Sequence, residues 1–194
     1  MPATLRMFVA LLPPEEAVDH LDAFLEVRRS AAPYRWASSE QLHVTLAFLG
    51  EVEERRIDDL TERLGRAAAK RTAFETAIAG GGAFPNAARA RVLWAGLDLD
   101  EAGRTQLGRL ATGCRAAANR AGIPVDGQRF RPHVTVARLG HPAEVSSWVR
   151  LLDGYAGPRW RAERITLVAS HLGEGPGGRP RYVDVQDFTL MAPH

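Results

Sequence analysis

Two histidines and two threonines stand in a phrase that the sequence repeats. His43 begins the eight residues HVTLAFLG, His133 begins HVTVARLG, and six of the eight letters agree. An imidazole, with a pKa of about 6.5, can accept or donate a proton near neutral pH, and a threonine hydroxyl can donate a hydrogen bond to an anionic oxygen. Two His-x-Thr units could therefore surround a phosphate and transfer protons to and from it.

The His-x-Thr spacing places both polar side chains on one face of a strand. Side chains alternate between the two faces, so His43 and Thr45 point the same way, roughly 6 to 7 Å apart, as do His133 and Thr135. The valines and leucines between them, and Phe48 of the first copy, are predicted on the opposite, apolar face. One such unit alone favours a packing or surface role, but two in equivalent contexts favour a shared site.

The segments around the two phrases show helical or strand periodicity. Apolar residues at three- and four-residue spacing predict helices over residues 15–29, 53–70, 101–121 and, more briefly, 143–152. Apolar or alternating runs predict strands over residues 6–12, 42–49, 73–79, 91–97, 133–138, 164–170 and 181–190. The glycines at 80–82 and the turn at Phe84-Pro85-Asn86 are expected to separate the third and fourth strands.

Each half of this predicted order contains one histidine strand. A duplicated α+β body, with two lobes related by an approximate two-fold axis, explains the repeat better than a parallel α/β sheet does. Two equivalent strands that face one another across a groove would present both His-x-Thr units to one site. We therefore expect residues 1–194 to form a single bilobal domain.

The composition is that of a globular protein, with 45% hydrophobic and 25% charged residues. The lone Cys114 can form neither an internal disulfide nor a cysteine-based metal site, and the apolar run from Met7 to Leu12 is too short for a signal peptide. We therefore expect a cytoplasmic protein with no membrane association. Nearly all basic residues are arginine, and Lys70 is the only lysine. Because arginine binds phosphate through a bidentate fork, this composition suits a phosphate-bearing partner.

Five stretches of the chain resemble one family. They are RMFVALLPP, LHVTLAFLG, GGGAFP with the following RVLWAGL, FRPHVTVARLG, and the late LVASHLGEGPGGRPRY. Together they resemble the two-histidine (2H) phosphoesterases and, within them, the bacterial RNA 2′,3′-cyclic phosphodiesterases, also called 2′-5′ RNA ligases. The resemblance extends over nearly the whole chain, and the four His and Thr positions show no departure from the family pattern.

The resemblance implies a bilobal α+β fold, in which each lobe has an antiparallel sheet flanked by helices and the groove between the lobes binds a cyclic phosphate. It implies hydrolysis of a terminal 2′,3′-cyclic phosphate to a 2′-phosphate, with 2′-5′ ligation as the reverse reaction. His43 would be the proton donor to the 3′ oxygen, His133 the proton acceptor that activates water, and Thr45 and Thr135 would hold phosphate oxygens. Only the family assigns these two proton roles, because the two copies are nearly symmetric.

The resemblance also implies partners and cofactors. The expected partners are RNA ends or nucleotides that bear a 2′,3′-cyclic phosphate, the expected state is a monomer, and neither a metal nor another cofactor is expected. A noncatalytic RNA-end binding module remains an alternative. A di-histidine metal hydrolase is a second alternative, but neither motif has a further Asp, Glu, His or Cys at ligand spacing.

Some further residues near the motifs are candidates for substrate contact. Arg131, two residues before His133, could contact the phosphate, although Pro132 interrupts the strand register that would position it. Arg138 is nominally on the apolar face, so a surface role is the preferred interpretation. Aromatic residues near the motifs could stack on a terminal base, and these are Trp36, Phe48 and Phe84.

Overall fold

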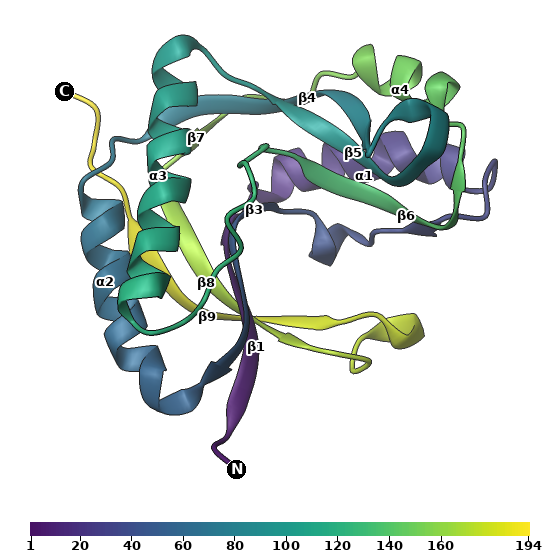
Figure 1. The fold of residues 1–194 in the computed structure, drawn as a ribbon. Coiled ribbons are helices and arrows are strands. Elements are labelled where there is room, and N and C mark those ends of the chain that lie inside the picture. The colour runs from purple at the N-terminus through teal and green to yellow at the C-terminus, as the bar shows by residue number, and fades with distance from the viewer.

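The computed structural model describes residues 1–194 and has the expected α+β composition (Figure 1). The strands are β1 (Thr4–Leu11), β2 (Arg35–Trp36), β3 (Val44–Glu53), β4 (Phe74–Phe84), β5 (Ala90–Asp98), β6 (Val134–Ala143), β7 (Trp160–Ala162), β8 (Arg164–His171) and β9 (Arg181–Thr189). The helices are α1 (Glu15–Arg29), α2 (Ile57–Ala69), α3 (Glu101–Arg120) and α4 (Ser146–Asp153). The predicted elements are all present, and only the short strands β2 and β7 were not predicted.

The strands divide into two lobes at one weak join. Their order is β7-β4-β5-β6-β3-β1-β8-β9, with β2 on the other side of β6, and the strands along this path pair antiparallel. At the centre, β3 and β6 are joined by a single residue pair, Val44 and Val134. We call the strands β3, β1, β8 and β9 lobe 1, and the strands β6, β5, β4, β7 and β2 lobe 2. The predicted pair of lobes, each with an antiparallel sheet, is confirmed.

The two lobes have equivalent strand orders around the join. Counted outward from the join, lobe 1 begins β3, β1, β8 and lobe 2 begins β6, β5, β4. Next to β3 lies β1, the first strand of the N-terminal half of the chain, and beyond it lies β8 from the C-terminal half. Next to β6 lies β5, the first strand of the C-terminal half, and beyond it lies β4 from the N-terminal half. The helices are exchanged as well, because α1 packs on lobe 2 and α3 packs on lobe 1. The lobes thus interlock, which holds the two histidine strands in a defined relation.

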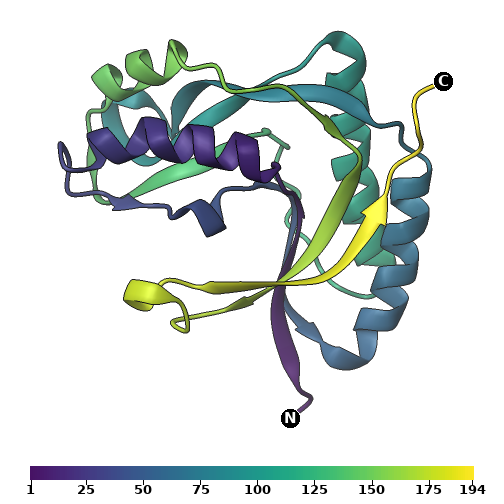
Figure 2. The same ribbon diagram turned by 180° about the vertical axis from the view of Figure 1, so that it is seen from behind.

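Helices cover one face of each lobe and leave the other face free. The pair α2 and α3 lies against lobe 1, and α1 and α4 lie against lobe 2 (Figure 2). On α2 the buried residues Leu60, Leu64 and Ala68 recur every four positions, as the sequence pattern predicts. Burial of each leucine stabilises the fold by roughly 1.5–3 kcal/mol. None of the helices is long and apolar enough to span a membrane.

The three glycines at positions 80–82 do not end a strand. β4 runs through them to Phe84, so the predicted end of this strand at residue 79 was wrong. A Cβ atom on Gly82 would lie 2.3 Å from the Trp94 ring, and one on Gly81 would lie 2.4 Å from the Leu152 Cβ atom. Glycine is therefore required here by the close approach of α4 and of the neighbouring strand, and it is not the signal of a turn.

Candidate active site

The single pair that joins the lobes sets the arrangement of the four predicted residues. Val44 and Val134 are antiparallel partners, so this register places His43 across from Thr135 and Thr45 across from His133. The two valines are fully buried and point to the apolar side, and their polar neighbours point to the opposite side. The two His-x-Thr units therefore come together at the join of the lobes, one from each lobe, as the predicted groove between the lobes requires.

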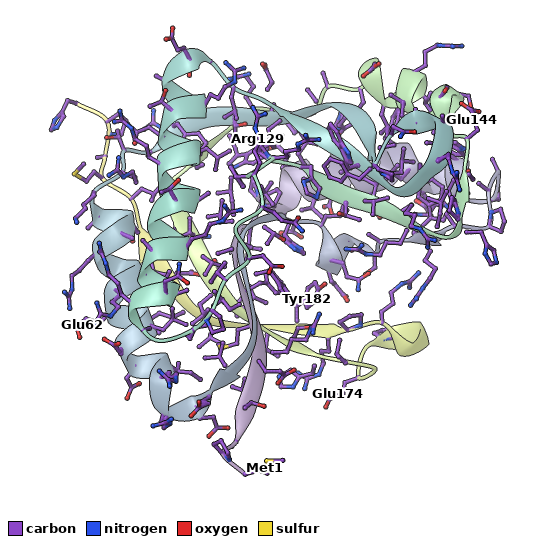
Figure 3. All side chains as sticks on the ribbon, viewed as in Figure 1. Met1, Glu62, Arg129, Glu144, Glu174 and Tyr182 are labelled. Carbon is purple, nitrogen blue, oxygen red and sulfur yellow. The ribbon has the colours of Figure 1, made fainter.

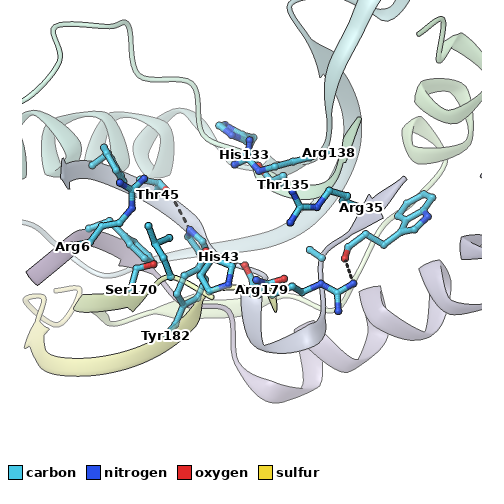
Figure 4. A pocket seen from close by; sticks show the side chains of 17 residues that line it. Arg6, Arg35, His43, Thr45, His133, Thr135, Arg138, Ser170, Arg179 and Tyr182 are labelled. Atoms are coloured by element: carbon cyan, nitrogen blue, oxygen red, sulfur yellow. Dashed lines mark hydrogen bonds between the residues drawn. The ribbon is translucent and has the colours of Figure 1, made fainter. Parts of the chain in front are cut away.

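A cavity of about 550 Å³ lies between the lobes at this join. All four predicted residues line it, two from each lobe (Figure 4). Tyr182 of β9 lies on the side of lobe 1 that faces lobe 2 (Figure 3), and it also lines the cavity. None of the other histidines in the chain does so. The repeat thus brings its polar residues to one place.

Both imidazoles are held by the same backbone contact. The Nδ1 atom of His43 lies 2.7 Å from the Gln41 carbonyl oxygen, and that of His133 lies 2.7 Å from the Arg131 carbonyl oxygen. Because a carbonyl oxygen only accepts, each Nδ1 carries the proton and each Nε2 is the free basic atom. The Thr45 hydroxyl donates to the His43 Nε2 atom at 3.0 Å. The carbonyls therefore select the same tautomer in both copies.

Aromatic rings fix the orientation of each imidazole. Phe8 stacks on His43 with ring centroids 4.7 Å apart, and Tyr182 meets the same imidazole edge-on at 5.6 Å. On the other copy, Phe84 meets His133 edge-on at 4.8 Å. These contacts restrict rotation of the rings, so each Nε2 atom has a defined position before any ligand binds.

Burial changes the proton affinity of both histidines. It lowers the pKa of His43 to about 4, against the effect of the Gln41 carbonyl and with further lowering by the charges of His133 and Arg138. Burial also lowers the pKa of His133, and the Arg138 charge acts in the same direction. Both imidazoles are therefore neutral near pH 7. A bound anion would raise both pKa values, because an opposite charge favours the protonated form.

A bulge in β3 turns Phe48 into the cavity. Val9 of β1 pairs with Ala47, but the next residue of β1, Ala10, pairs with Thr45, so Leu46 is an extra residue. The extra residue reverses the alternation of faces, and Phe48 lines the cavity with 47% of its surface exposed. The prediction that Phe48 lies on the apolar face was therefore wrong.

The same bulge recurs in β6 and turns Arg138 into the cavity. Leu93 of β5 pairs with Ala137 and Trp94 with Thr135, which leaves Val136 as the extra residue. Arg138 is therefore on the same face as Thr135 and lines the cavity. The preferred interpretation of Arg138 as a surface residue outside the site was wrong, because strict alternation does not hold across a bulge.

The side chain of Arg131 does not reach the cavity. It is exposed and is not among the residues that line the cavity. Its carbonyl oxygen, however, accepts the hydrogen bond from His133 described above. The part of Arg131 that the structure brings to the site is thus its backbone, which orients an imidazole.

The cavity is strongly positive. The arginines that line it are Arg6, Arg35, Arg138 and Arg179, and no Asp or Glu side chain does so. Three of these come from segments remote from the two motifs, so motif reasoning could not find them. Elsewhere in the chain, no group of three or more His, Cys, Asp or Glu side chains is placed to hold a metal ion. The arrangement offers two bases, two hydroxyls and several guanidinium groups to an anion.

The chain is similar to known proteins over most of its length. The sequence profile of the 2′-5′ RNA ligase superfamily matches residues 13–174. A protein of Thermus thermophilus named RNA 2′,3′-cyclic phosphodiesterase is 33% identical over 199 residues, which cover 98% of this chain and 92% of that protein. A protein of the same name from Geobacillus stearothermophilus is 33% identical over 132 residues, which cover 68% of this chain and only 41% of that protein.

A solved structure has a similar fold. The crystal structure of E. coli LigT complexed with 3′-AMP superposes with a TM-score of 0.77 at 25% sequence identity. The superposition covers 97% of this chain and 99% of that chain. The similarity therefore includes both lobes and the join between them.

Proposed function

Because the chain belongs to the 2′-5′ RNA ligase superfamily, we propose that it is an RNA 2′,3′-cyclic phosphodiesterase that opens the cyclic phosphate at an RNA end to a 2′-phosphate. The observation that carries the proposal is the presence of two fixed imidazoles and two hydroxyls in one cavity, on pseudo-equivalent strands. Both relatives described above bear the name of this activity. The cavity, which has no carboxylate, suits an anionic substrate.

The reaction needs one base and one acid. The Nε2 atom of His133 takes a proton from water as the water oxygen bonds to phosphorus. The bond between phosphorus and the 3′ oxygen breaks, and His43 gives its Nε2 proton to that oxygen, which leaves a 2′-phosphate and a 3′-hydroxyl. The direction of the two proton transfers follows the family resemblance, since the backbone contacts of the two imidazoles are equivalent.

Burial of His43 has a consequence for its role as the acid. With a pKa of about 4, His43 is neutral near pH 7 and would gain its proton as the anionic substrate binds. The buried surroundings that disfavour the imidazolium also favour its loss of the proton to the leaving oxygen. Each histidine would then contribute about two to four orders of magnitude through proton transfer.

The remaining polar groups would hold the phosphate during the reaction. The hydroxyls of Thr45 and Thr135 flank the imidazoles, and the Arg138 guanidinium lies on the same face. Negative charge on the nonbridging oxygens increases in the transition state, so donors aimed at these oxygens would accelerate the reaction by about 10²- to 10³-fold each. Arg138 adds a full charge and a planar fork to the two hydroxyls.

Phe48 provides a surface for the terminal base. It is the exposed aromatic ring on the cavity face of β3, and the Arg6 guanidinium lies 4.7 Å from its centroid. Bases stack on such rings with little dependence on sequence. We therefore assign the Arg6 and Phe48 side of the cavity to the nucleobase. The same site would catalyse 2′-5′ ligation if a 5′-hydroxyl replaced water as the nucleophile, because the same bond between phosphorus and the 3′ oxygen breaks.

Hydrolysis of adenosine 2′,3′-cyclic phosphate in excess EDTA, followed by phosphorus NMR, tests the proposal. We expect turnover in EDTA and a 2′-phosphate product, because imidazoles perform both proton transfers. A 3′-phosphate product would reverse the assigned roles of His43 and His133. Activity that EDTA removes and Zn²⁺ or Mn²⁺ restores would indicate a metal hydrolase. Binding without turnover would indicate a noncatalytic RNA-end module.

A further inference from the structure

Two of the cavity arginines are placed opposite one another without a counter-charge. Arg35 on β2 and Arg138 on β6 are directly paired across the two strands. Like charges in this position destabilise a sheet. Neither guanidinium has a hydrogen bond or an ion pair with another residue, and no carboxylate lines the cavity. The fold therefore places two like charges at opposed positions, and an anion bound beside Arg35 would offset their repulsion.

Arg179 adds a third guanidinium to this region from the opposite lobe. It lies in the hairpin between β8 and β9 of lobe 1, and its Nη2 atom donates to the Trp36 carbonyl oxygen of lobe 2 at 3.0 Å. Trp36 directly follows Arg35 in β2, so the contact holds Arg179 beside that strand. A guanidinium has five N–H donors, so the bond to one carbonyl leaves donors free for a ligand.

The charge of the cavity exceeds the needs of one cyclic phosphate. A 2′,3′-cyclic phosphate has a single negative charge, and the proposed function already assigns the His-x-Thr units and Arg138 to it. Arg35 and Arg179 lie to one side of the two histidines, and Arg6 lies to the other side, next to Phe48 (Figure 4). Three groups extend from the ribose of the terminal nucleotide, namely the cyclic phosphate, the base and the 5′ oxygen. The proposed function assigns positions in the cavity to the first two groups. The side of the cavity with Arg35 and Arg179 is therefore available to the group on the 5′ oxygen.

We propose that Arg35 and Arg179 form a second phosphate subsite, which binds the phosphate on the 5′ oxygen of the terminal nucleotide. The subsite rests on the proposed function, and it makes the enzyme prefer a cyclic phosphate at an RNA end over a free cyclic nucleoside phosphate. In an RNA chain this 5′ phosphate is the last phosphodiester before the end. Specificity for RNA thus arises from two arginines that take no part in the proton transfers.

Three substrates separate the contribution of the phosphate from that of a second nucleoside. They are adenosine 2′,3′-cyclic phosphate, the same compound with a 5′-phosphate, and the dinucleotide ApA with a 2′,3′-cyclic phosphate end. We expect kcat/KM to be about 10- to 100-fold higher for the second and third substrates than for the first, as charged hydrogen bonds to one phosphate would give. We also expect this preference to decrease as salt is added.

The variants Arg35→Gln and Arg179→Gln test the two residues. Each should reduce the ratio of kcat/KM between the 5′-phosphorylated and the unphosphorylated substrate by about 3- to 10-fold, since the two arginines share a preference of about 10- to 100-fold. Arg35→Gln is the cleaner change, because Arg179 also makes the contact with the Trp36 carbonyl. Arg35→Gln should leave the thermal unfolding midpoint unchanged or raise it, since it removes a like-charge pair.

Arg109→Gln is the matched control. Arg109 is exposed on α3, which covers the face of lobe 1 away from the cavity, and it has no ion pair. The variant removes the same charge from the protein, so a loss of preference through overall charge alone would appear here too. We expect this variant to have the same ratio of kcat/KM between the 5′-phosphorylated and the unphosphorylated substrate as the wild-type protein.

Each other outcome of the experiment has a definite meaning. Equal kcat/KM for the three substrates, or a preference for the dinucleotide alone, would overturn the phosphate subsite, as would a preference that survives both variants. Absence of turnover on every substrate would overturn the proposed hydrolase. In that event, the subsite is tested by binding. The ratio of the dissociation constants of adenosine 2′-phosphate with and without a 5′-phosphate is then measured for the wild-type protein and for the same variants.

Discussion

The two histidine strands have the same backbone and differ at one position of the cavity. β3 and β6 share the order of buried and exposed residues from Val44 to Leu49 and from Val134 to Leu139, and each contains a bulge after its threonine. The bulge turns Phe48 into the cavity from β3 and Arg138 from β6. The repeat therefore supplies a symmetric pair of imidazoles, and one position distinguishes the two sides of the cavity, with an aromatic ring on one and a guanidinium group on the other.

The surroundings of the two histidines differ as well. His43 is covered by the rings of Phe8 and Tyr182, whereas Phe84 and the more distant Trp94 contact His133. Burial accordingly lowers the pKa of His43 as far as about 4. Burial lowers the pKa of His133 as well, so the two imidazoles share a tautomer and a direction of pKa shift but differ in the rings that contact them.

Replacement of the histidines should have the largest effect. Under the proposed mechanism, in which both histidines transfer protons in one reaction, His43→Ala and His133→Ala should each lower kcat for adenosine 2′,3′-cyclic phosphate by about 10²- to 10⁴-fold. The double variant should lose little more than the worse single variant, since groups that act as a unit are not additive. Steady-state kinetics of the three variants measures this. Near wild-type turnover in either single variant would show that only one copy of the repeat is functional.

Arg138→Ala should have the next largest effect, a decrease in kcat/KM of about 10²- to 10³-fold, because the guanidinium stabilises charge on the phosphate oxygens. Arg138→Lys should recover part of the loss, as it retains the charge without the planar fork. Arg131→Ala provides the comparison, since that side chain is exposed outside the cavity. A larger loss in Arg131→Ala than in Arg138→Ala would contradict the assignment that the bulge indicates.

Phe48→Ala should have a smaller effect, and it should differ in kind from that of Arg138→Ala. Loss of a stacking surface for the base should raise KM by about 10-fold and leave kcat nearly unchanged. Phe48→Tyr, which retains the ring, should restore KM. The measurement is kcat and KM for the 2′,3′-cyclic phosphates of adenosine and cytidine. A lower kcat with an unchanged KM would place Phe48 near the reacting phosphate instead of near the base.

The sequence predicts the central features of the molecule well. The order of the long helices and strands, the two lobes and the convergence of His43, Thr45, His133 and Thr135 all follow from periodicity and from the repeat. The errors arise where the alternation of side chains between the two faces of a strand is interrupted by a β-bulge. A bulge adds one residue without changing the apolar pattern, so Phe48 and Arg138 were assigned to the wrong face.

Contacts between distant segments account for the other omissions. The glycines of β4 resemble a turn until the positions of Trp94 and Leu152 are known. Arg6, Arg35 and Arg179 lie outside both motifs, and the two-residue strand β2 that positions Arg35 is too short to give a periodic signal. These features depend on tertiary packing, which a local pattern does not contain.

The last prediction concerns the stability of the fold at low pH, not the reaction. His43 has a pKa of about 4 in the folded protein, against about 6.5 in an unfolded chain, so the unfolded state binds more protons between these values. The free energy of unfolding should therefore decrease as the pH falls from about 6.5 to about 4, by about 1–3 kcal/mol from this residue. The pKa of His133 is lowered too, so His133 contributes in the same direction.

Urea unfolding in phosphate-free buffers across this pH range measures each contribution. The variants are His43→Gln and His133→Gln, with the exposed His141→Gln as the control. We expect His43→Gln to flatten the pH dependence most and His141→Gln to leave it unchanged, because deeper burial of an imidazole makes its protonation more costly. Equal slopes in all three variants would mean that the two copies of the motif do not differ in burial as the structure indicates.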